Sequence, residues 1–219
     1  MDFGLAFTYP FQDPDWAKKL GLAALVALIP ILGQIFVLGW MLDITRRVYL
    51  QDATPMPNLD FGKQFVNGLK LLLVTLAYTL PVYLILAPLF IVAATADSMD
   101  PDTANMLAGL ASICCGGLAL LYGIFISFIL PAAYGNMVVK DQLSAAFRLS
   151  EITRLVRAAS GAYILAFLGT VITGSIIAPL GFIACAVGVL FTYAYAMAVN
   201  GHLYGQAYNE AVRNNAFAG

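Results

Sequence analysis

Few residues of this 219-residue chain could take part in chemistry, and their spacing does not group them. The single histidine, His202, lies close to Asn200 and Tyr204, and Glu210 is the one carboxylate nearby. A histidine acts as a general base or a metal ligand only with a carboxylate, a thiol or a second histidine within reach. We therefore interpret His202 and Asn200 as polar side chains near the interfacial end of an apolar run, without a catalytic role.

Three cysteines lie inside apolar runs, and two of them, Cys114 and Cys115, stand just before Gly116-Gly117. An apolar helix does not favour the reactive thiolate, so the small side chains predict close helix contact rather than redox or metal chemistry. The motifs GxSxG and HExxH and the Walker phosphate loop do not occur in the sequence. We expect no catalytic residue, no cofactor and no metal, and a protein that is not an enzyme.

Composition places the chain in a membrane. Hydrophobic residues make up 61% of it and charged residues only 11%, against roughly 45–50% and 25% in soluble domains. One globular core of this length could not bury so many apolar side chains. Lys and Arg number 11 and Asp and Glu 12, which leaves no basic field for nucleic acid. The expected fold class is an all-α, polytopic membrane helical bundle, with the lipid bilayer as its partner.

Four stretches without charged residues are long enough to span a bilayer, which takes about 20 helical residues. They are Leu20–Leu42, Leu71–Ala96, Thr103–Val139 and Ala158–Asn209. The last would be about 78 Å long as one helix, so it must fold back. Ala178-Pro179-Leu180-Gly181 predicts the turn, because proline breaks helices and glycine tolerates unusual backbone angles. Beside the first stretch, this gives about four full spans: Leu71–Ala96, Thr103–Val139, Gly161–Ala178 and Phe182–Gly201.

The first stretch is broken at Pro30-Ile31-Leu32-Gly33. Either it crosses the bilayer once with a kink, or it enters and returns as a re-entrant hairpin with arms Pro14–Ile29 and Gly33–Leu50. The hairpin places all 11 Lys and Arg on one side, whereas a single crossing puts Lys18-Lys19 on the other side. The positive-inside rule favours the hairpin and makes the basic side cytoplasmic. Both termini are then cytoplasmic, and the acidic turn Asp97–Asp102 lies outside.

We expect the chain to reverse at this break, with Trp16 and Arg46 at the same interface. Pro30 ends a helix, and Gly33 supplies the positive φ angle of a tight reversal, so Gly33→Val should damage folding more than Pro30→Ala. Gln34 has two interpretations. It satisfies backbone groups that the break sets free, or it belongs to a broken-helix binding site like those of transporters.

The predicted organisation is a single membrane domain, 1–219, with three parts. They are a broken hairpin (14–50), a helical hairpin (58–140) and a second helical hairpin (143–209). Each helical hairpin begins with a predicted interfacial helix on the cytoplasmic leaflet, Phe61–Gly68 and Leu143–Ser160. Arginines occupy one side of the second interfacial helix, where each would gain about 1 kcal/mol from anionic headgroups.

Several short segments resemble a known family. They are Phe7–Phe11, Asp15-Trp16, Lys19, Leu28–Gly33, Gly39-Trp40, Arg46–Val48, Pro57–Phe61 and Gly68-Leu69. Together they resemble the prokaryotic membrane proteins catalogued as domain of unknown function 4013, most closely in the N-terminal part of the chain. Leu59 stands where that family often has tryptophan. The resemblance implies a prokaryotic cytoplasmic (inner) membrane protein, and it brings no reaction, substrate or site.

The leading functional hypothesis is a non-catalytic membrane protein that acts in assembly or as an accessory subunit. Its partner would be a second copy or another membrane protein. Small-residue edges, such as the GxxxG spacing of Gly201–Gly205, and the lack of charge within the spans favour it. A transporter or permeation component is the alternative, because of the broken hairpin. An enzyme acting on lipid is a third, since interfacial helices could admit lipid.

Overall fold

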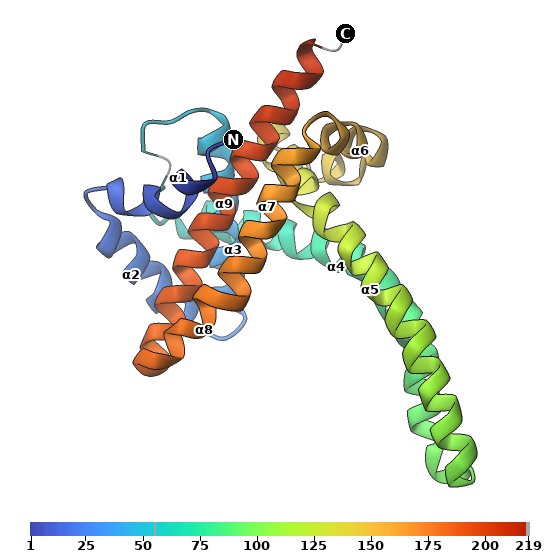
Figure 1. The fold of residues 1–219 in the computed structure, drawn as a ribbon. Coiled ribbons are helices and arrows are strands. Elements are labelled where there is room, and N and C mark those ends of the chain that lie inside the picture. The colour runs from blue at the N-terminus through green and yellow to red at the C-terminus, as the bar shows by residue number, and fades with distance from the viewer. Residues whose placement is uncertain (55, 218–219) are drawn as a thin grey trace. The chain divides into compact units, whose positions relative to one another are not determined.

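The structure, a computed structural model, describes residues 1–54 and 56–217, with the side chains of 184–187 and 216–217 left out. The described part is helical (Figure 1). The α-helices are α1 (Phe3–Thr8), α2 (Trp16–Ala27), α3 (Leu32–Tyr49), α4 (Phe61–Thr95), α5 (Pro101–Lys140), α6 (Leu149–Ala158), α7 (Ser160–Ile172), α8 (Ala178–Leu180) and α9 (Cys185–Phe217). Short 3₁₀ or π-helical turns cover Tyr9–Gln12, Ala96–Ser98, Leu143–Phe147, Thr173–Ile177 and Gly181–Ala184.

The chain forms two compact units. That both belong to the single membrane domain expected from the sequence stays a prediction. The first unit contains residues 1–74 and 128–219, and the second contains Thr75–Ser127. Within the first unit, α9 runs through the middle and contacts α1, α2, α3, α6 and α7 (Figure 1). Trp40, Leu20 and Ile44 are fully buried in its core. The first unit therefore has a protein interior of its own.

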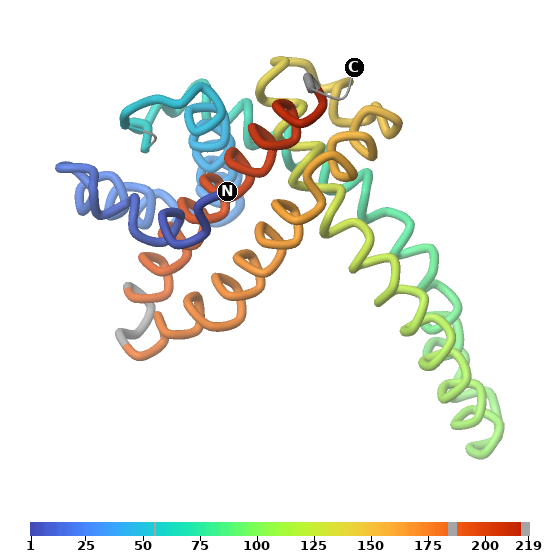
Figure 2. Tube along the Cα trace, turned by 45° about the horizontal axis from the view of Figure 1, so that its top comes forward, coloured from blue at the N-terminus to red at the C-terminus, as the bar shows by residue number. Residues whose placement is uncertain are grey.

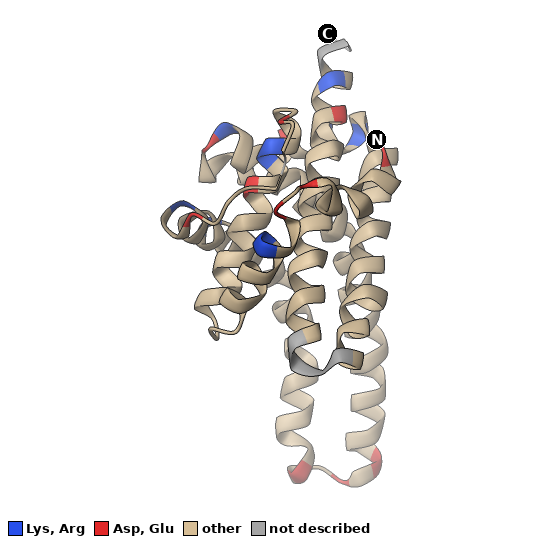
Figure 3. Ribbon diagram, turned by 90° about the vertical axis from the view of Figure 1, so that its left-hand side faces the viewer, with Lys and Arg blue, Asp and Glu red and all other residues tan. Residues whose placement is uncertain are grey.

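The second unit is a hairpin made by the end of α4 and most of α5. Ile126, 7% exposed, is its one buried residue. Large apolar side chains such as Leu84 and Ile113 are 68% and 77% exposed. Its acidic residues lie at the turn Asp97–Asp102 (Figure 3). Water would not tolerate so much contiguous apolar surface, which indicates a membrane environment.

The α2–α3 hairpin reverses the chain at the predicted break. Leu20, Ala23 and Ala24 of α2 pack in one cluster with Trp40 and Ile44 of α3. Both Trp16 and Val48 pack against that cluster, which places the start of α2 beside the end of α3. The predicted reversal is therefore present, and Trp16 lies at the same end as Arg46. Whether the hairpin enters a bilayer stays a prediction.

The reason we gave for the glycine at this break was wrong. The positive φ angle belongs to Ile31 (65°), and no described glycine has one. Gly33 is needed for space instead, because a Cβ atom there would overlap the carbonyl oxygen of Val26 on the facing arm. A backbone hydrogen bond closes the turn, in which Leu32 N–H donates to the carbonyl oxygen of Pro30 (2.7 Å).

Helix α3 also packs closely against α4 and α9 at positions where one of the two helices carries a glycine. A Cβ atom on Gly39 would overlap the backbone of Gln64, and one on Gly68 would overlap the carbonyl oxygen of Ile35. The predicted helix Phe61–Gly68 is the first part of α4, which continues through Gly68 at this crossing. That this part lies on a membrane surface stays a prediction.

On the other side of α3, the GxxxG pair of α9 makes the contact. A Cβ atom on Gly201 would lie 2.6 Å from Met41 O, and one on Gly205 would lie 2.7 Å from Thr45 O. Thr45 Oγ1 donates a 3.1 Å hydrogen bond to Gly201 O, which ties the two helices at this point. The GxxxG spacing therefore serves packing inside the unit.

The predicted helix Leu143–Ser160 is shorter in the structure. Asn136 donates a hydrogen bond to the carbonyl of Ala145, which belongs to a 3₁₀ turn, and α6 begins only at Leu149. Ile152 and Leu155, 0% and 4% exposed, face inward, and α6 contacts α9. Protein packing therefore takes up part of the apolar face that we assigned to the membrane surface, whereas Phe147 and Leu149 remain exposed.

The long C-terminal stretch folds back as predicted. Helices α7 and α9 run side by side in opposite directions (Figure 2). The turn lies a few residues later than expected, because α8 carries the helix through Ala178–Leu180 before a 3₁₀ turn at Gly181–Ala184. Thr192 Oγ1 of α9 donates to Ala178 O (3.1 Å), which braces the turn.

Three helical segments of the described part are long and apolar enough to cross a membrane. They are Phe61–Ser98, Pro101–Lys140 and Ser160–Ile183. The fourth predicted span, Phe182–Gly201, includes side chains outside the described residues. Within the first unit, Lys and Arg lie toward one end of the bundle, and none is seen among the described residues of the opposite end (Figure 3).

The α2–α3 turn yields a first prediction, in which close contact rather than backbone angle decides the outcome. Gly33→Ala should already lower the stability of the folded protein by about 3 kcal/mol or more, because the facing backbone cannot move aside. Gly33→Val should be worse, and Pro30→Ala should cost less. Thermal unfolding in detergent measures the effect, and Gly21→Ala is the matched control, since nothing lies within 4 Å of that Cβ position. If Gly33→Ala and Gly21→Ala lowered the unfolding temperature equally, the close contact at Gly33 would not be what limits this position.

Candidate functional site

The structure does not bring the five candidate residues from the sequence together. Pro30, Gly33 and Gln34 lie at the α2–α3 turn, whereas Asn200 and His202 lie on α9. Gln34 Nε2 donates a 3.1 Å hydrogen bond to the carbonyl oxygen of Ala27, the last residue of α2. That bond is the backbone role of our first interpretation, and it uses one of the two N–H donors of the amide.

Asn200 joins α9 to α7. Its Oδ1 accepts a 3.0 Å hydrogen bond from Thr173 Oγ1, and both residues are buried. One turn further along α9, the hydroxyls of Thr170 and Tyr204 lie 3.1 Å apart. These polar pairs satisfy each other between two apolar helices, as buried polar groups must.

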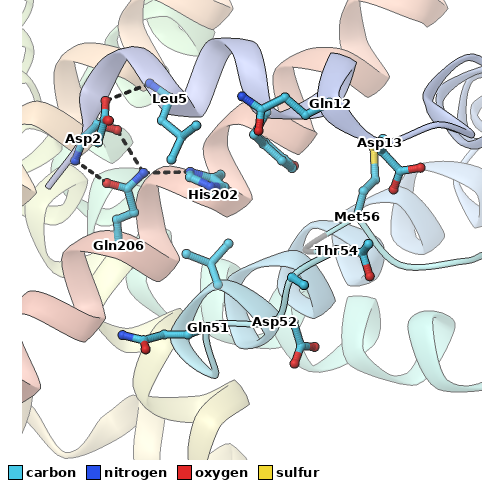
Figure 4. A pocket seen from close by; sticks show the side chains of 13 residues that line it. Asp2, Leu5, Gln12, Asp13, Gln51, Asp52, Thr54, Met56, His202 and Gln206 are labelled. Carbon is cyan, nitrogen blue, oxygen red and sulfur yellow. Dashed lines mark hydrogen bonds between the residues drawn. The ribbon is translucent and has the colours of Figure 1, made fainter.

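His202 lines a cavity of about 350 Å³ in the first unit (Figure 4). Its walls come from the N-terminal segment, the end of α3 with the loop after it, and α9. The polar lining residues are Asp2, Gln12, Asp13, Gln51, Asp52, Thr54, His202 and Gln206. Asp13 is already paired, because Lys19 Nζ lies 2.6 Å from its Oδ2.

The hydrogen bonds around His202 fix its protonation. Gln206 Oε1 accepts from the backbone N–H of Asp2 (2.6 Å), so the Gln206 amide N–H₂ faces His202 Nδ1 at 2.8 Å. Nδ1 must then accept, which leaves the proton of a neutral imidazole on Nε2. The Tyr9 ring stacks on the imidazole with centroids 4.2 Å apart. A proton on Nδ1 would place two donors against each other.

His202 lies just beyond the predicted end of its span. Burial lowers the pKa of His202 to about 4, and the nearby Asp2 carboxylate only partly opposes this shift. Glu210, the one carboxylate we considered as its partner, instead pairs with the amino group of Met1 at 2.8 Å. The histidine is therefore a neutral, stacked packing group at physiological pH, and its surroundings do not prepare it as a general base.

Sequence reasoning missed a buried carboxylate on α3. Asp43, 4% exposed, lies one residue beyond the uncharged stretch that ends at Leu42. Its carboxylate is 3.2 Å from Lys63 Nζ, and it accepts hydrogen bonds from the side-chain amides of Gln64 and Asn67, each 3.3 Å long. These donors come from the first turns of α4. The cluster therefore fastens α4 to α3 beside the Gly39 contact.

The remaining candidates for chemistry do not converge. Among the described residues, no three His, Cys, Asp or Glu side chains lie together as metal ligands would. Cys114 is exposed and Cys115 half-buried, both in the hairpin of the second unit. The close contact predicted beside them is not made in the described part, because Cβ atoms on Gly116 and Gly117 would meet nothing within 4 Å.

Comparison with known families gives one match. The family described as "Protein of unknown function (DUF4013)" matches residues 22–199, most of the chain. The chain belongs to this family. The DUF4013 match begins within α2, includes the α2–α3 turn, α3 and the second unit, and ends in α9 just before Asn200. No curated protein and no solved structure matches the chain.

The site yields a second prediction, on pH. His202 carries a folded-state pKa below its unfolded value, so its contribution to stability is fully present above pH 6.5 and is lost as pH falls toward 4. Protonation of the unfolded chain should reduce stability by up to about 1.4 kcal/mol for each pH unit in that window.

Thermal unfolding of the wild type and of His202→Asn between pH 7.5 and 4.5 checks this prediction. Asparagine keeps an acceptor near Gln206 and removes the titration. The variant should start less stable, because it loses the stack on Tyr9, but should lose less stability on acidification. The same pH dependence in both proteins would show that other groups control it.

Proposed function

We propose that this DUF4013 protein is a multi-pass protein of the prokaryotic cytoplasmic membrane, with both ends in the cytoplasm, that acts without catalysis in assembly or as an accessory subunit. One observation carries the proposal. The hairpin Thr75–Ser127 has almost no protein interior, and its apolar side chains, such as Leu84 and Ile113, point outward all around it. Such a hairpin needs lipid, another membrane helix, or both, to cover it.

The tip of the α2–α3 hairpin supports insertion from the cytoplasmic side. Every residue from Leu28 to Leu32 is exposed and none is polar, with Ile31 at 74%. At the other end of the same hairpin lie Lys18 and Arg46. An exposed apolar tip opposite a basic end is the pattern of a wedge in one leaflet, with its cations at the headgroups. Arms of 12 and 18 residues would be about 18 and 27 Å long, short of a full crossing of about 30 Å.

The second unit supports assembly through an open helix edge. Gly109, Gly116 and Gly123 recur every seven residues on α5, and a Cβ atom on any of them would meet nothing within 4 Å. Small residues at this spacing line one face of a helix and let a second helix approach closely. The edge is therefore available to a helix of a second copy or of another membrane protein.

The alternatives have less support among the described residues. A transporter needs polar groups at the break that face a substrate, whereas Gln34 uses one amide N–H to bond the carbonyl of Ala27 within the hairpin. A proton path needs a carboxylate that can exchange its partner, and Asp43 is held by three side chains. A lipid-acting enzyme needs a nucleophile or a base beside the lipid, and His202 faces the Gln206 amide.

A third prediction tests the topology. Single cysteines placed beside Lys18 and at Ala53, Leu143 and Arg213 should react with a membrane-impermeant maleimide only after the cytoplasmic side is opened. A cysteine at Ser98 should react from outside. The native cysteines Cys114, Cys115 and Cys185 are first replaced by serine. Labelling from outside beside Lys18 alone would restore a single crossing, and a cytoplasmic Ser98 would overturn the topology.

A fourth prediction tests assembly through α5. A photo-crosslinking amino acid at Ser112, which lies between Gly109 and Gly116, should give a discrete protein adduct in native membranes, because a helix partner lies within reach of this edge. Leu121, 66% exposed on the same helix, is the control and should give mainly lipid adducts. Gly116→Leu should remove the protein adduct by filling the edge. Lipid adducts alone at both positions would refute assembly through this edge.

A further inference from the structure

Two adjoining cavities open along α2 in the first unit. The first has a volume of about 290 Å³ and is lined by Asp15, Lys18, Lys19, Leu22, Val26, Asn58, Leu59 and Phe61. The second, about 200 Å³, is lined by Val26, Ile29, Leu32, Gly33, Phe36, Phe61 and Phe65. Val26 and Phe61 belong to both walls, so the two cavities adjoin along α2, and we call them together the α2 groove.

The two ends of the α2 groove differ in chemistry. Toward the α2–α3 turn, its wall carries only apolar side chains and a glycine. The rings of Phe36 and Phe61 stack there with centroids 4.7 Å apart, which gives the groove a rigid floor. The charged end begins at the first turn of α2, where Asp15 and Lys18 lie three residues apart on adjacent turns of the wall.

Two of the three charged side chains at that end, Lys18 and Asp15, form no ion pair within the described residues. Lys19 is committed, because its Nζ lies 2.6 Å from Asp13 Oδ2 and 3.0 Å from Met56 O. Lys18 and the Asp15 carboxylate, by contrast, form no ion pair with any residue in 1–54 or 56–217. The groove thus presents one free cation and one free anion, together with a neutral pair.

The groove also has the depth of one leaflet. From Lys18 to Ile29 the helix rises about 17 Å, close to half of the roughly 30 Å hydrocarbon core. On the proposed topology, the charged end lies at the cytoplasmic headgroups and the apolar end lies among acyl chains. This inference therefore rests on the proposed insertion of the hairpin.

We propose that the α2 groove binds one phosphatidylethanolamine molecule of the cytoplasmic leaflet. Lys18 would contact the phosphodiester, Asp15 the primary ammonium, and the apolar end one acyl chain. A zwitterionic headgroup matches the paired free charges, whereas an anionic glycerol headgroup would leave Asp15 without a partner. A second helix does not fit, because a helix with its side chains is about 10–12 Å across and the groove holds only the two small volumes given above.

The test is lipid retention. The full chain is reconstituted in nanodiscs of equimolar dioleoyl phosphatidylethanolamine, phosphatidylglycerol and phosphatidylcholine, and is then released into detergent for native mass spectrometry. The wild type should retain one lipid, phosphatidylethanolamine in preference to the other two. Lys18→Gln and Asp15→Asn should each lower its retention by about fivefold, the effect of one headgroup contact. Arg154→Gln, which removes an exposed cation outside the groove, should not.

The proposed acyl-chain site at the apolar end of the α2 groove is tested by filling it with a larger side chain. Ile29→Trp places a large ring in the apolar end and should displace the lipid, whereas Leu25→Trp changes an exposed residue of the same helix outside the groove and should leave retention unchanged. Equal retention of the three lipids, a preference for phosphatidylglycerol, or unchanged retention in Lys18→Gln would overturn the proposal.

A separate measurement distinguishes failure of the lipid site from failure of the proposed hairpin insertion. A spin label at Leu28 in the same nanodiscs should be accessible to oxygen and shielded from a polar nickel relaxant. A shielded label with unselective lipid retention would overturn the lipid site alone. A label open to the polar relaxant would overturn the insertion, and with it the lipid site.

Discussion

The structure depends on direct backbone contact between helices at α3. Gly33 meets Val26 across the turn, Gly39 meets Gln64 of α4, and Gly201 of α9 meets the carbonyl of Met41. In lipid, helices gain little from hiding apolar side chains from one another, so close packing and hydrogen bonds must hold them together. A side chain at any of these crossings would separate two helices. The polar clusters beside the crossings could then no longer form.

Much of the chain's organisation was predictable because charge and proline act locally. The end of α4, the limits of α5, the reversal at Pro30 and the return of the C-terminal stretch all follow from which residues a helix or a bilayer excludes. The role of Gly33 was not predictable in this way. A glycine that allows a positive φ and one that allows a close approach look the same in sequence, and only the facing arm distinguishes them.

The roles of the polar candidate residues also depended on partners that the sequence did not show. Asp43 was passed over because the uncharged stretch ends just before it, and its partners belong to a helix that begins at Phe61. For His202 we looked to Glu210, whereas the residue that holds its ring, Gln206, lies one turn away on the same helix. The i to i+4 spacing was the available signal. The stacking of Tyr9 on His202 joins residues too far apart in sequence to be inferred without an alignment.

The two units differ in what must cover them. The first has a buried core around Trp40 and buried polar pairs such as Thr173 with Asn200, so protein contacts define much of its shape. The second has almost no interior, and its helices join through contacts such as the 2.9 Å bond from the Tyr122 hydroxyl to Tyr78 O. Its backbone is helical, with Pro81 and Pro88 as two positions that supply no N–H inside α4. Its apolar surface would be uncovered in water. On the proposed membrane location, lipid covers this hairpin, and a partner helix at its glycine edge would replace lipid rather than water.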